Sequence, residues 1–149
     1  MNILDKIIAH KKIEIAAAKT VVSLQQLQQS PNFNRPVFSM KQFLLDEGKT
    51  GIIAEFKRKS PSKGIINDQV LVEDVTAAYT LHGASALSIL TDENFFGGST
   101  ADLIKARVNN IPVLRKDFMI DEYQIIEAKA LGADIILLIA AILTPIQIS

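Results

Sequence analysis

Four short apolar runs, separated by segments with helix signals, constrain the fold of this chain more than any other feature. The apolar runs, rich in β-branched and other strand-forming residues, cover residues 52–56, 86–90, 113–118 and 134–139. The helix signals between them cover residues 70–82, 99–108 and 121–131. This alternation is typical of βαβ units, in which parallel strands are joined by right-handed crossovers. The sequence therefore predicts an α/β fold with a parallel sheet over residues 51–149.

The first fifty residues follow a different pattern and are interpreted as a helical extension. Apolar side chains recur near helical spacing over residues 3–20, and a polar linker follows them. A short helix is expected at residues 40–47, where Gly48 is a typical residue just beyond a helix end. We therefore expect one domain over residues 1–149, with the extension at residues 1–48.

The last residues of the chain carry the signal of a further helix start. Thr144 suits the N-cap position and Pro145 the first helical position, yet only four residues follow Pro145. We therefore expect that the chain has been cut, and that its four βα units are the first half of a (β/α)8 barrel, which typically has about 250 residues. A flavodoxin-like sheet remains the alternative, because this pattern alone favours the barrel only modestly.

Composition excludes several classes of function. Lys plus Arg equals Asp plus Glu, at 16 each, so charge does not favour a nucleic-acid partner. The absence of cysteine excludes disulfides, thiolate metal sites and a cysteine nucleophile, and no His/Asp/Glu spacing predicts a metal site. The N-terminus lacks the apolar region of a secretory signal, and the longest apolar run, residues 135–143, is too short to span a membrane. We predict a soluble, cytoplasmic protein.

The clearest sign of chemistry lies at the end of the first apolar run. Because side chains alternate along a strand, Ile53, Glu55 and Lys57 share one face. A carboxylate and an ammonium are costly at the end of a buried strand unless they pair or do chemistry, and α/β proteins place their active sites there. The SPSKG loop that follows offers hydroxyls, backbone groups and positive charge to an anion. An ordinary ion pair within the strand is the alternative.

Lys116 holds a similar place on the third apolar run. By alternation Lys116 and Phe118 face inward with Leu114, while Arg115 and Asp117 face the other way. A partly desolvated lysine near other cations can act as a general acid near neutral pH. A solvated cluster formed by Lys116 and its two charged neighbours is the alternative.

Other candidates carry weaker signals. Phe96 lies in the FFGGS segment after the second run, where its ring could form a wall for a planar ligand or simply cover the core. Leu137 is the inward residue of the fourth run and is expected to fill space. His10 and His82 lie on predicted helices, which we expect to be remote from the strand ends, so neither is assigned to catalysis.

The motifs in this chain resemble those of the indole-3-glycerol phosphate synthase family. The matching stretches occur in order and at similar separations, and they are EFKRKSPSKG, SILTDENFFGGS, PVLRKDFMIDEYQI and LGADIILLIAAIL. The resemblance covers essentially the whole chain, including the helical extension. It implies a (β/α)8 barrel whose N-terminal helical segment crosses the catalytic mouth. It also implies a carbon–carbon lyase of tryptophan biosynthesis that uses no cofactor.

The resemblance assigns roles to the candidate residues. The family converts 1-(2-carboxyphenylamino)-1-deoxyribulose 5-phosphate to indole-3-glycerol phosphate, carbon dioxide and water. By resemblance Lys116 is the general acid at ring closure, Lys57 holds substrate anions and assists proton transfer, and Glu55 orients both lysines and balances their charge. The implied substrate site is lined by Ser60, Pro61, Phe96, Phe118 and Leu137, the last three around the anthranilate ring.

The resemblance also implies groups that this chain does not contain. In the family, later strands supply a further catalytic glutamate, an asparagine and phosphate-binding loops, so we expect this chain alone to be inactive or nearly so. Exposed edge strands and an apolar inner face favour self-association. Two other functions stay open, namely a different phosphate-binding barrel enzyme similar to phosphoribosylanthranilate isomerase, and a non-catalytic half-barrel module.

Overall fold

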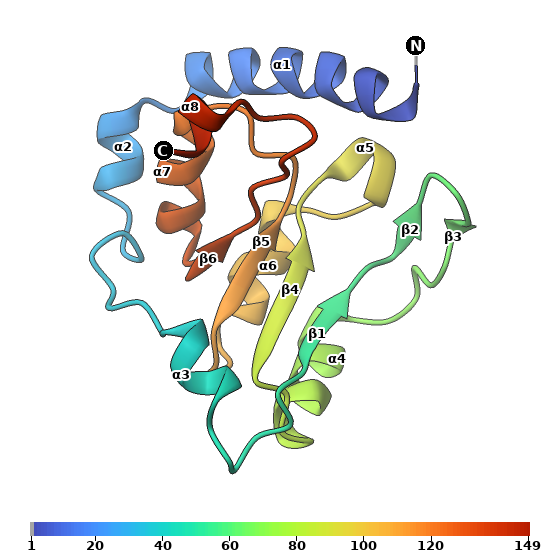
Figure 1. Cartoon of the computed structure of the whole chain (residues 1–149), viewed down its shortest axis with the longest axis vertical. Helices are drawn as coiled ribbons and strands as arrows, with labels where there is room; N and C mark the ends of the chain where they lie inside the picture. The colour runs from blue at the N-terminus through green and yellow to red at the C-terminus, as the bar shows by residue number, and fades with distance from the viewer. Residues whose placement is uncertain (1) are drawn as a thin grey trace.

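A four-stranded parallel sheet forms the centre of the computed structural model, which describes residues 2–149 (Figure 1). The strands lie side by side in chain order, and they are β1 (Ile53–Phe56), β4 (Ala86–Leu90), β5 (Val113–Lys116) and β6 (Ile135–Ile136). The helices that connect them are α4 (Val72–Leu81), α6 (Thr100–Ala106) and α7 (Glu122–Leu131). The predicted alternation of strands and helices is therefore confirmed.

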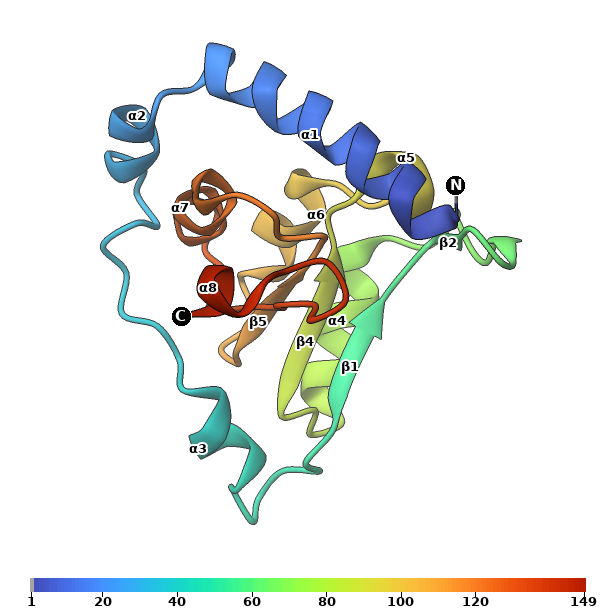
Figure 2. The same ribbon diagram turned by 45° about the horizontal axis from the view of Figure 1, so that its top comes forward.

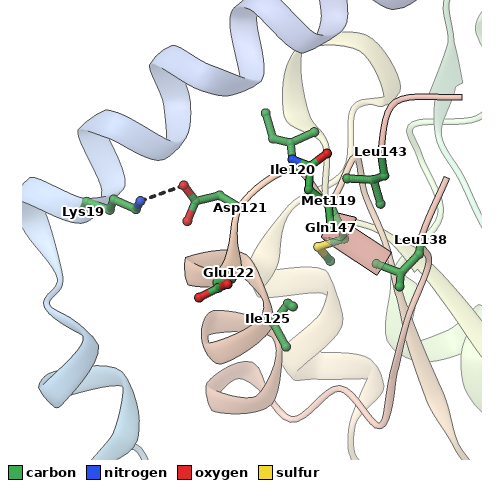
Figure 3. A pocket seen from close by; sticks show the side chains of 9 residues that line it. All are labelled: Lys19, Met119, Ile120, Asp121, Glu122, Ile125, Leu138, Leu143 and Gln147. Atoms are coloured by element: carbon green, nitrogen blue, oxygen red, sulfur yellow. Dashed lines mark hydrogen bonds and ion pairs between the residues drawn. The ribbon is translucent and has the colours of Figure 1, made fainter. Parts of the chain in front are cut away.

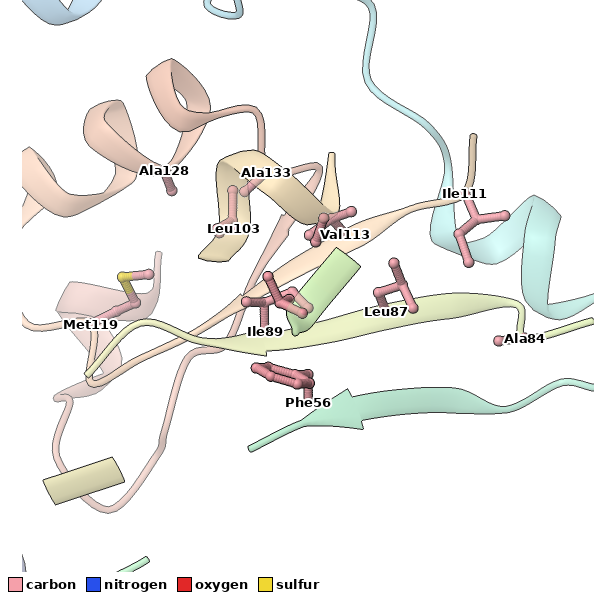
Figure 4. Packing of buried hydrophobic residues seen from close by; sticks show 12 residues of the cluster. Phe56, Ala84, Leu87, Ile89, Leu103, Ile111, Val113, Met119, Ala128 and Ala133 are labelled. Atoms are coloured by element: carbon pink, nitrogen blue, oxygen red, sulfur yellow. The ribbon is translucent and has the colours of Figure 1, made fainter. Parts of the chain in front are cut away.

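The connecting helices all cover the same face of the sheet. Alternate strand residues point into one buried core, where they meet side chains from α4, α6 and α7 (Figure 4). The strand residues of this core are Phe56, Leu87, Ile89 and Val113, and the helix residues are Val72, Leu103, Ala106 and Ala128. Consecutive strand order with helices on one face is the winding of a (β/α) barrel, whereas a flavodoxin-like sheet reverses its order and has helices on both faces. Over residues 2–149 the sheet is an open part of such a barrel, with β1 and β6 at its edges.

Three of the four strands are shorter than the apolar runs that predicted them, whereas β4 matches its run at residues 86–90. The third run extends to residue 118 and the fourth covers residues 134–139, but β5 ends at Lys116 and β6 has only two residues. An apolar run indicates burial, whereas a strand also needs a neighbour to pair with. The pairing of β5 with β6 ends at Arg115 and Ile136, and the chain then turns away.

Several short elements occupy segments that were predicted as linker or loop. They are α2 (Leu24–Gln28), α5 (Glu93–Phe96) and the antiparallel hairpin of β2 (Lys59–Ser60) and β3 (Gly64–Ile65). Such short elements present too few residues for a periodic pattern. Conversely, α3 (Met40–Leu44) is shorter than the predicted helix at residues 40–47. The last helix, α8 (Pro145–Ile148), begins after Thr144 as predicted. Within residues 2–149, each helix is too short or too polar to serve as a membrane span.

The N-terminal helix α1 (Ile3–Val21) crosses the carboxyl end of the sheet (Figures 1 and 2). Its second half and α2 pack against α7, where Ile15, Leu27 and Tyr123 form a separate buried cluster. The Tyr123 hydroxyl donates a hydrogen bond to the carbonyl oxygen of Val22 at 2.9 Å. The extension thus finds the partner for its apolar face on α7.

Asp134, at the start of β6, anchors the other end of the extension. Its Oδ1 accepts hydrogen bonds from Arg35 Nη2 at 2.6 Å and from the backbone N–H of Phe38 at 2.8 Å. Its Oδ2 accepts from the backbone N–H of Val113 at 2.9 Å and from the guanidinium of Arg107. The Asp134 side chain is fully buried, so one carboxylate joins the extension, α6 and β5.

Replacement of this carboxylate should destabilise the fold strongly. In Asp134→Ala two arginines lose a buried partner, and we expect the free energy of unfolding to fall by about 3 kcal/mol or more. Urea unfolding measures the change. The matched control is Asp68→Ala. Asp68 is exposed, so its replacement should lower the free energy of unfolding by less than about 0.5 kcal/mol. Equal losses in the two variants would contradict the anchoring role of Asp134.

Candidate active site

Glu55, Lys57 and Lys116 come together at the carboxyl end of the sheet. Lys57 Nζ lies 3.3 Å from Glu55 Oε1, and Lys116 Nζ donates a hydrogen bond to Glu55 Oε2 at 3.1 Å. The three side chains are 31%, 34% and 36% exposed in the order named, so a ligand can reach them. The predicted ion pair of Glu55 with Lys57 therefore forms, and the other oxygen of Glu55 contacts Lys116 of β5.

The register of the sheet explains how Lys116 reaches Glu55. Glu55 is paired with Ser88 on β4, and Ser88 is paired with Leu114 on β5. Lys116 lies two residues beyond Leu114, on the same face and nearer the carboxyl end. Ser88 is small and buried, and its hydroxyl donates to Glu55 Oε2 at 3.2 Å. Sequence reasoning missed Ser88, although a polar residue at the inward position of an apolar strand is a usable signal.

The two lysines determine the ionisation of Glu55. Its partial burial acts to raise the pKa of the carboxyl group, but the hydrogen bond and the charge of Lys116, together with those of Lys57, outweigh burial. The pKa of Glu55 is therefore held below its ordinary value. The site presents one carboxylate between two ammonium groups.

Two aromatic rings, which follow β4 and β5, lie beside each other. The ring centroids of Phe96 and Phe118 are 5.9 Å apart, with the planes tilted by 41°. Phe96 belongs to α5, whose first turn is capped by the side chain of Asp92. After α5 the chain passes so close to β4 that a Cβ at Gly98 would collide with the carbonyl oxygen of Leu90. Gly98 thus allows the chain to return to the sheet directly after the turn that carries Phe96.

The remaining predicted site residues, Ser60, Pro61 and Leu137, lie in the hairpin after β1 and just after β6. The β2–β3 hairpin carries Ser60 and Pro61 beyond the end of β1 (Figure 1). Ser60 is buried, and its Oγ accepts the backbone N–H of Lys63 at 3.2 Å, while Pro61 is exposed at the turn. Leu137 is half-buried just after β6. Their contribution to substrate binding stays a prediction.

The alternative interpretation of Lys116, a solvated cluster with its neighbours, is wrong. Arg115 and Asp117 are both 3% exposed and face the helix side of the sheet. Arg115 pairs with Glu127 of α7 at 2.6 Å, and Asp117 lies 3.0 Å from Nζ of Lys11 in α1. Alternation therefore separates the inward lysine from two buried structural charges.

The prediction that His10 is remote from the strand ends is also wrong. Because α1 crosses the sheet, His10 contacts Asn94 in α5, and its ring packs edge-on against Phe95 with the centroids 5.9 Å apart. Periodicity identified the helix but did not place it. The His10 contacts are with α5 rather than with Glu55 or its two lysines, so they give no catalytic role to the ring.

A pocket of about 440 Å³ lies between the end of α1, the start of α7 and the C-terminal segment (Figure 3). Lys19 and Asp121 form an ion pair of 2.7 Å at one side of it, and Ile125 and Leu138 contribute apolar walls. Its lining does not include Glu55, Lys57 or Lys116, so we assign it no part in the chemistry of those groups. Over residues 2–149 no three His, Cys, Asp or Glu side chains are grouped as metal ligands.

Comparison with known proteins identifies the family. The family model described as indole-3-glycerol phosphate synthase matches residues 4–149. The chain belongs to the indole-3-glycerol phosphate synthase family. It is 51% identical over 143 residues to the Bacteroides thetaiotaomicron protein of that name, covering 95% of this chain and 55% of that protein. It is 45% identical over 151 residues to the Bordetella pertussis protein of that name, covering 99% of this chain and 58% of that protein.

These figures define how much of the family the chain represents. It spans a little more than half the length of the curated relatives that it matches. The match to a family of (β/α)8 barrels agrees with the winding of the sheet and with the open edges at β1 and β6. The resemblance drawn from the four sequence motifs is confirmed.

The ionisation of Glu55 can be tested directly. Lys116→Met removes a hydrogen bond and a charge but leaves the partial burial, so we expect the pKa of Glu55 to rise. Titration of the glutamate carboxyls by ¹³C NMR measures it. Because folding lowers this pKa, Glu55 stabilises the fold above its unfolded pKa, and that contribution disappears as the pH falls through the folded pKa.

The control for this titration is Lys105→Met. Lys105 pairs with Glu73 at 2.9 Å on the surface and does not contact Glu55. An unchanged pKa of Glu55 in Lys116→Met, or an equal shift in Lys105→Met, would contradict the assigned coupling.

Proposed function

We propose that this chain carries one wall of an indole-3-glycerol phosphate synthase active site. The observation that supports the proposal most directly is the placement of Glu55 between Lys57 and Lys116, and the paired rings of Phe96 and Phe118 support it further. The proposed reaction is that of a carboxy-lyase acting on 1-(2-carboxyphenylamino)-1-deoxyribulose 5-phosphate. This substrate combines an aromatic ring with anionic groups, which matches a site made of rings and ammonium groups.

Each charged residue has a distinct role in the proposal. Ring closure needs a proton at the ketone oxygen of the substrate while the aromatic carbon attacks the ketone carbon. Lys116 supplies that proton as general acid. Lys57 holds substrate anions and assists proton transfer, and Glu55 orients both ammonium groups because each of its oxygens contacts one of them. Loss of carbon dioxide then restores the aromatic ring, and loss of a hydroxyl completes the indole.

The apolar residues account for recognition of the ring. Phe96 and Phe118 present a tilted pair of faces, and an aromatic ligand can pack against them with offset geometry. Leu137 would close this apolar side, and Ser60 and Pro61 would line the substrate site from the β2–β3 hairpin. The proposal also includes near inactivity of this chain by itself, because the family's further catalytic groups belong to later strands.

Substrate binding tests the proposed site without requiring turnover. The substrate should bind to this chain in calorimetry, and Lys116→Met should weaken binding by about ten- to a hundred-fold, because a hydrogen bond to a charged group is lost. Lys105→Met is the control and should bind like the unmodified chain. Equal binding by Lys116→Met would contradict the proposed site. Appreciable formation of indole-3-glycerol phosphate by the unmodified chain would contradict its proposed inactivity.

We also propose that the chain self-associates through its open sheet. Edge strands β1 and β6 carry unpaired backbone groups on the sides that face away from β4 and β5, and Ile53 on β1 is 42% exposed. Light scattering should therefore detect a species larger than the monomer at micromolar concentration. Ile53→Lys, which places a charge on the edge strand, should shift the population toward monomer. A compact monomer for the unmodified chain would overturn this proposal.

A further inference from the structure

We propose that Lys11 of α1 is a positioning residue for the candidate site, because it joins the two turns that carry Phe96 and Phe118. The role in substrate recognition rests on the proposed function. The positioning of the two rings rests only on the contacts of Lys11 with Asp92 and Asp117 and on what those carboxylates hold.

Lys11 is fully buried between two carboxylates that follow neighbouring strands. Its Nζ lies 2.9 Å from Asp92 Oδ1 and 3.0 Å from Asp117 Oδ1, and it donates to both carboxylate oxygens of Glu14 at 2.9 Å. Asp92 is 0% exposed and Asp117 3%. Burial acts to lower the pKa of Lys11, but the charge of Asp117 and the contacts with Glu14 and Asp92 outweigh it and raise the pKa. The ammonium is therefore charged inside the protein.

Asp92 connects Lys11 to Phe96. Its Oδ2 accepts the backbone N–H groups of Phe95 at 2.9 Å and of Phe96 at 3.3 Å, and so caps α5. Its Oδ1 is buried and receives no hydrogen bond from residues 2–149, although Nζ of Lys11 lies beside it. Lys11 is thus the charge that compensates this oxygen, and through Asp92 it determines where α5 begins.

Asp117 connects Lys11 to Phe118 and to the end of β5. Its Oδ1 accepts the backbone N–H of Phe118 at 2.8 Å, and its Oδ2 accepts the hydroxyl of Thr91 at 2.6 Å. Burial acts to raise the pKa of Asp117, but the charges of Lys11 and Arg115 lower it below the ordinary value. The residue lies directly after Lys116, so its position also constrains the end of the strand that carries the proposed general acid.

The contacts of Lys11 with Asp92 and Asp117 explain why the rings of Phe96 and Phe118 meet. Each ring follows a carboxylate that caps its own turn, and the two carboxylates face the same ammonium. Without Lys11 two buried negative charges would lie close together, which is unfavourable in a site of low dielectric constant. The turns would then separate or admit water, and the ring pair would lose its spacing.

Amide exchange on Lys11→Met tests the positioning role locally. Hydrogen–deuterium exchange by NMR should become about tenfold faster or more at the amides of Phe96 and Phe118, because the two carboxylates that accept these amides repel each other and move when their shared ammonium is lost. The ring-to-ring NOE of these two residues should also be lost. The amide of Leu87, which donates to the carbonyl oxygen of Pro112 at 2.8 Å in the sheet, should be unaffected and reports on the fold.

The matched control is Lys19→Met, which removes a second ion pair of the same helix. Lys19 pairs with Asp121 at 2.7 Å but is 46% exposed and lies away from Asp92 and Asp117. We expect exchange at Phe96 and Phe118 to stay within about twofold of the unmodified chain. Faster exchange in both variants would show that α1 acts only by its general docking, and unchanged exchange in folded Lys11→Met would overturn the proposal.

A second variant covers the case in which Lys11→Met does not fold. The triple variant Lys11→Met, Asp92→Asn and Asp117→Asn removes the buried charges. It does not restore the link that Lys11 makes between the two turns. The amides of Phe96 and Phe118 should still exchange faster than in the unmodified chain, and rates equal to it would overturn the positioning role.

Substrate binding to the same variants separates this inference from the proposed function. Lys11→Met should bind 1-(2-carboxyphenylamino)-1-deoxyribulose 5-phosphate about tenfold more weakly or worse, because displaced rings no longer fit the substrate, whereas Lys19→Met should not. Faster exchange with unchanged binding would overturn the role in recognition. If the unmodified chain does not bind the substrate, the proposed function fails, while the exchange data still decide whether Lys11 positions the rings.

Discussion

Coverage of one face of the parallel sheet by helices is the constraint on which the rest of the structure depends. The helices cover a single face, so Phe56, Ile89 and Val113 must point toward them, and every second residue must point away. A slip of one residue in β1 would turn Glu55 toward the apolar core, and a slip of one residue in β5 would do the same to Lys116. The same packing that stabilises the fold therefore determines which charged groups meet at the carboxyl end of the sheet.

Buried carboxylates attach the helical extension at both ends of that sheet. At the carboxyl end, Asp92 and Asp117 enclose Lys11, and near the amino end Asp134 binds Arg35 and Arg107. Burial of such charges is costly, so these pairs do not by themselves imply a large net stabilisation. Their effect is geometric. A buried carboxylate without its cation would be very unfavourable, so α1 has one favoured position across the strand ends. The extension therefore belongs to the architecture of the candidate site.

The open edges of the sheet show which part of a (β/α)8 barrel this chain represents. The chain contains charged groups on β1 and β5 that form an ion pair, and a pair of aromatic rings that follow β4 and β5. Relatives of this family are close to twice as long, and a (β/α)8 barrel surrounds its site with loops from all eight strands. The proposed binding of substrate and the proposed near inactivity of this chain are compatible, because electrostatic and aromatic contacts can hold a molecule without completing its reaction.

Local patterns in the sequence determined the α/β class, most helix starts and the inward group of Glu55, Lys57 and Lys116. These are short-range properties, since alternation within a strand and a capping pair each involve residues only a few positions apart. Only the tertiary structure decided the role of Ser88, the burial of Lys11 and the approach of His10 to α5. It also decided the extents of β6 and of the β2–β3 hairpin. The hydrogen bond from Lys116 to Glu55 spans 61 positions of sequence, and it forms because strand register, which no local pattern encodes, brings the two side chains to one edge.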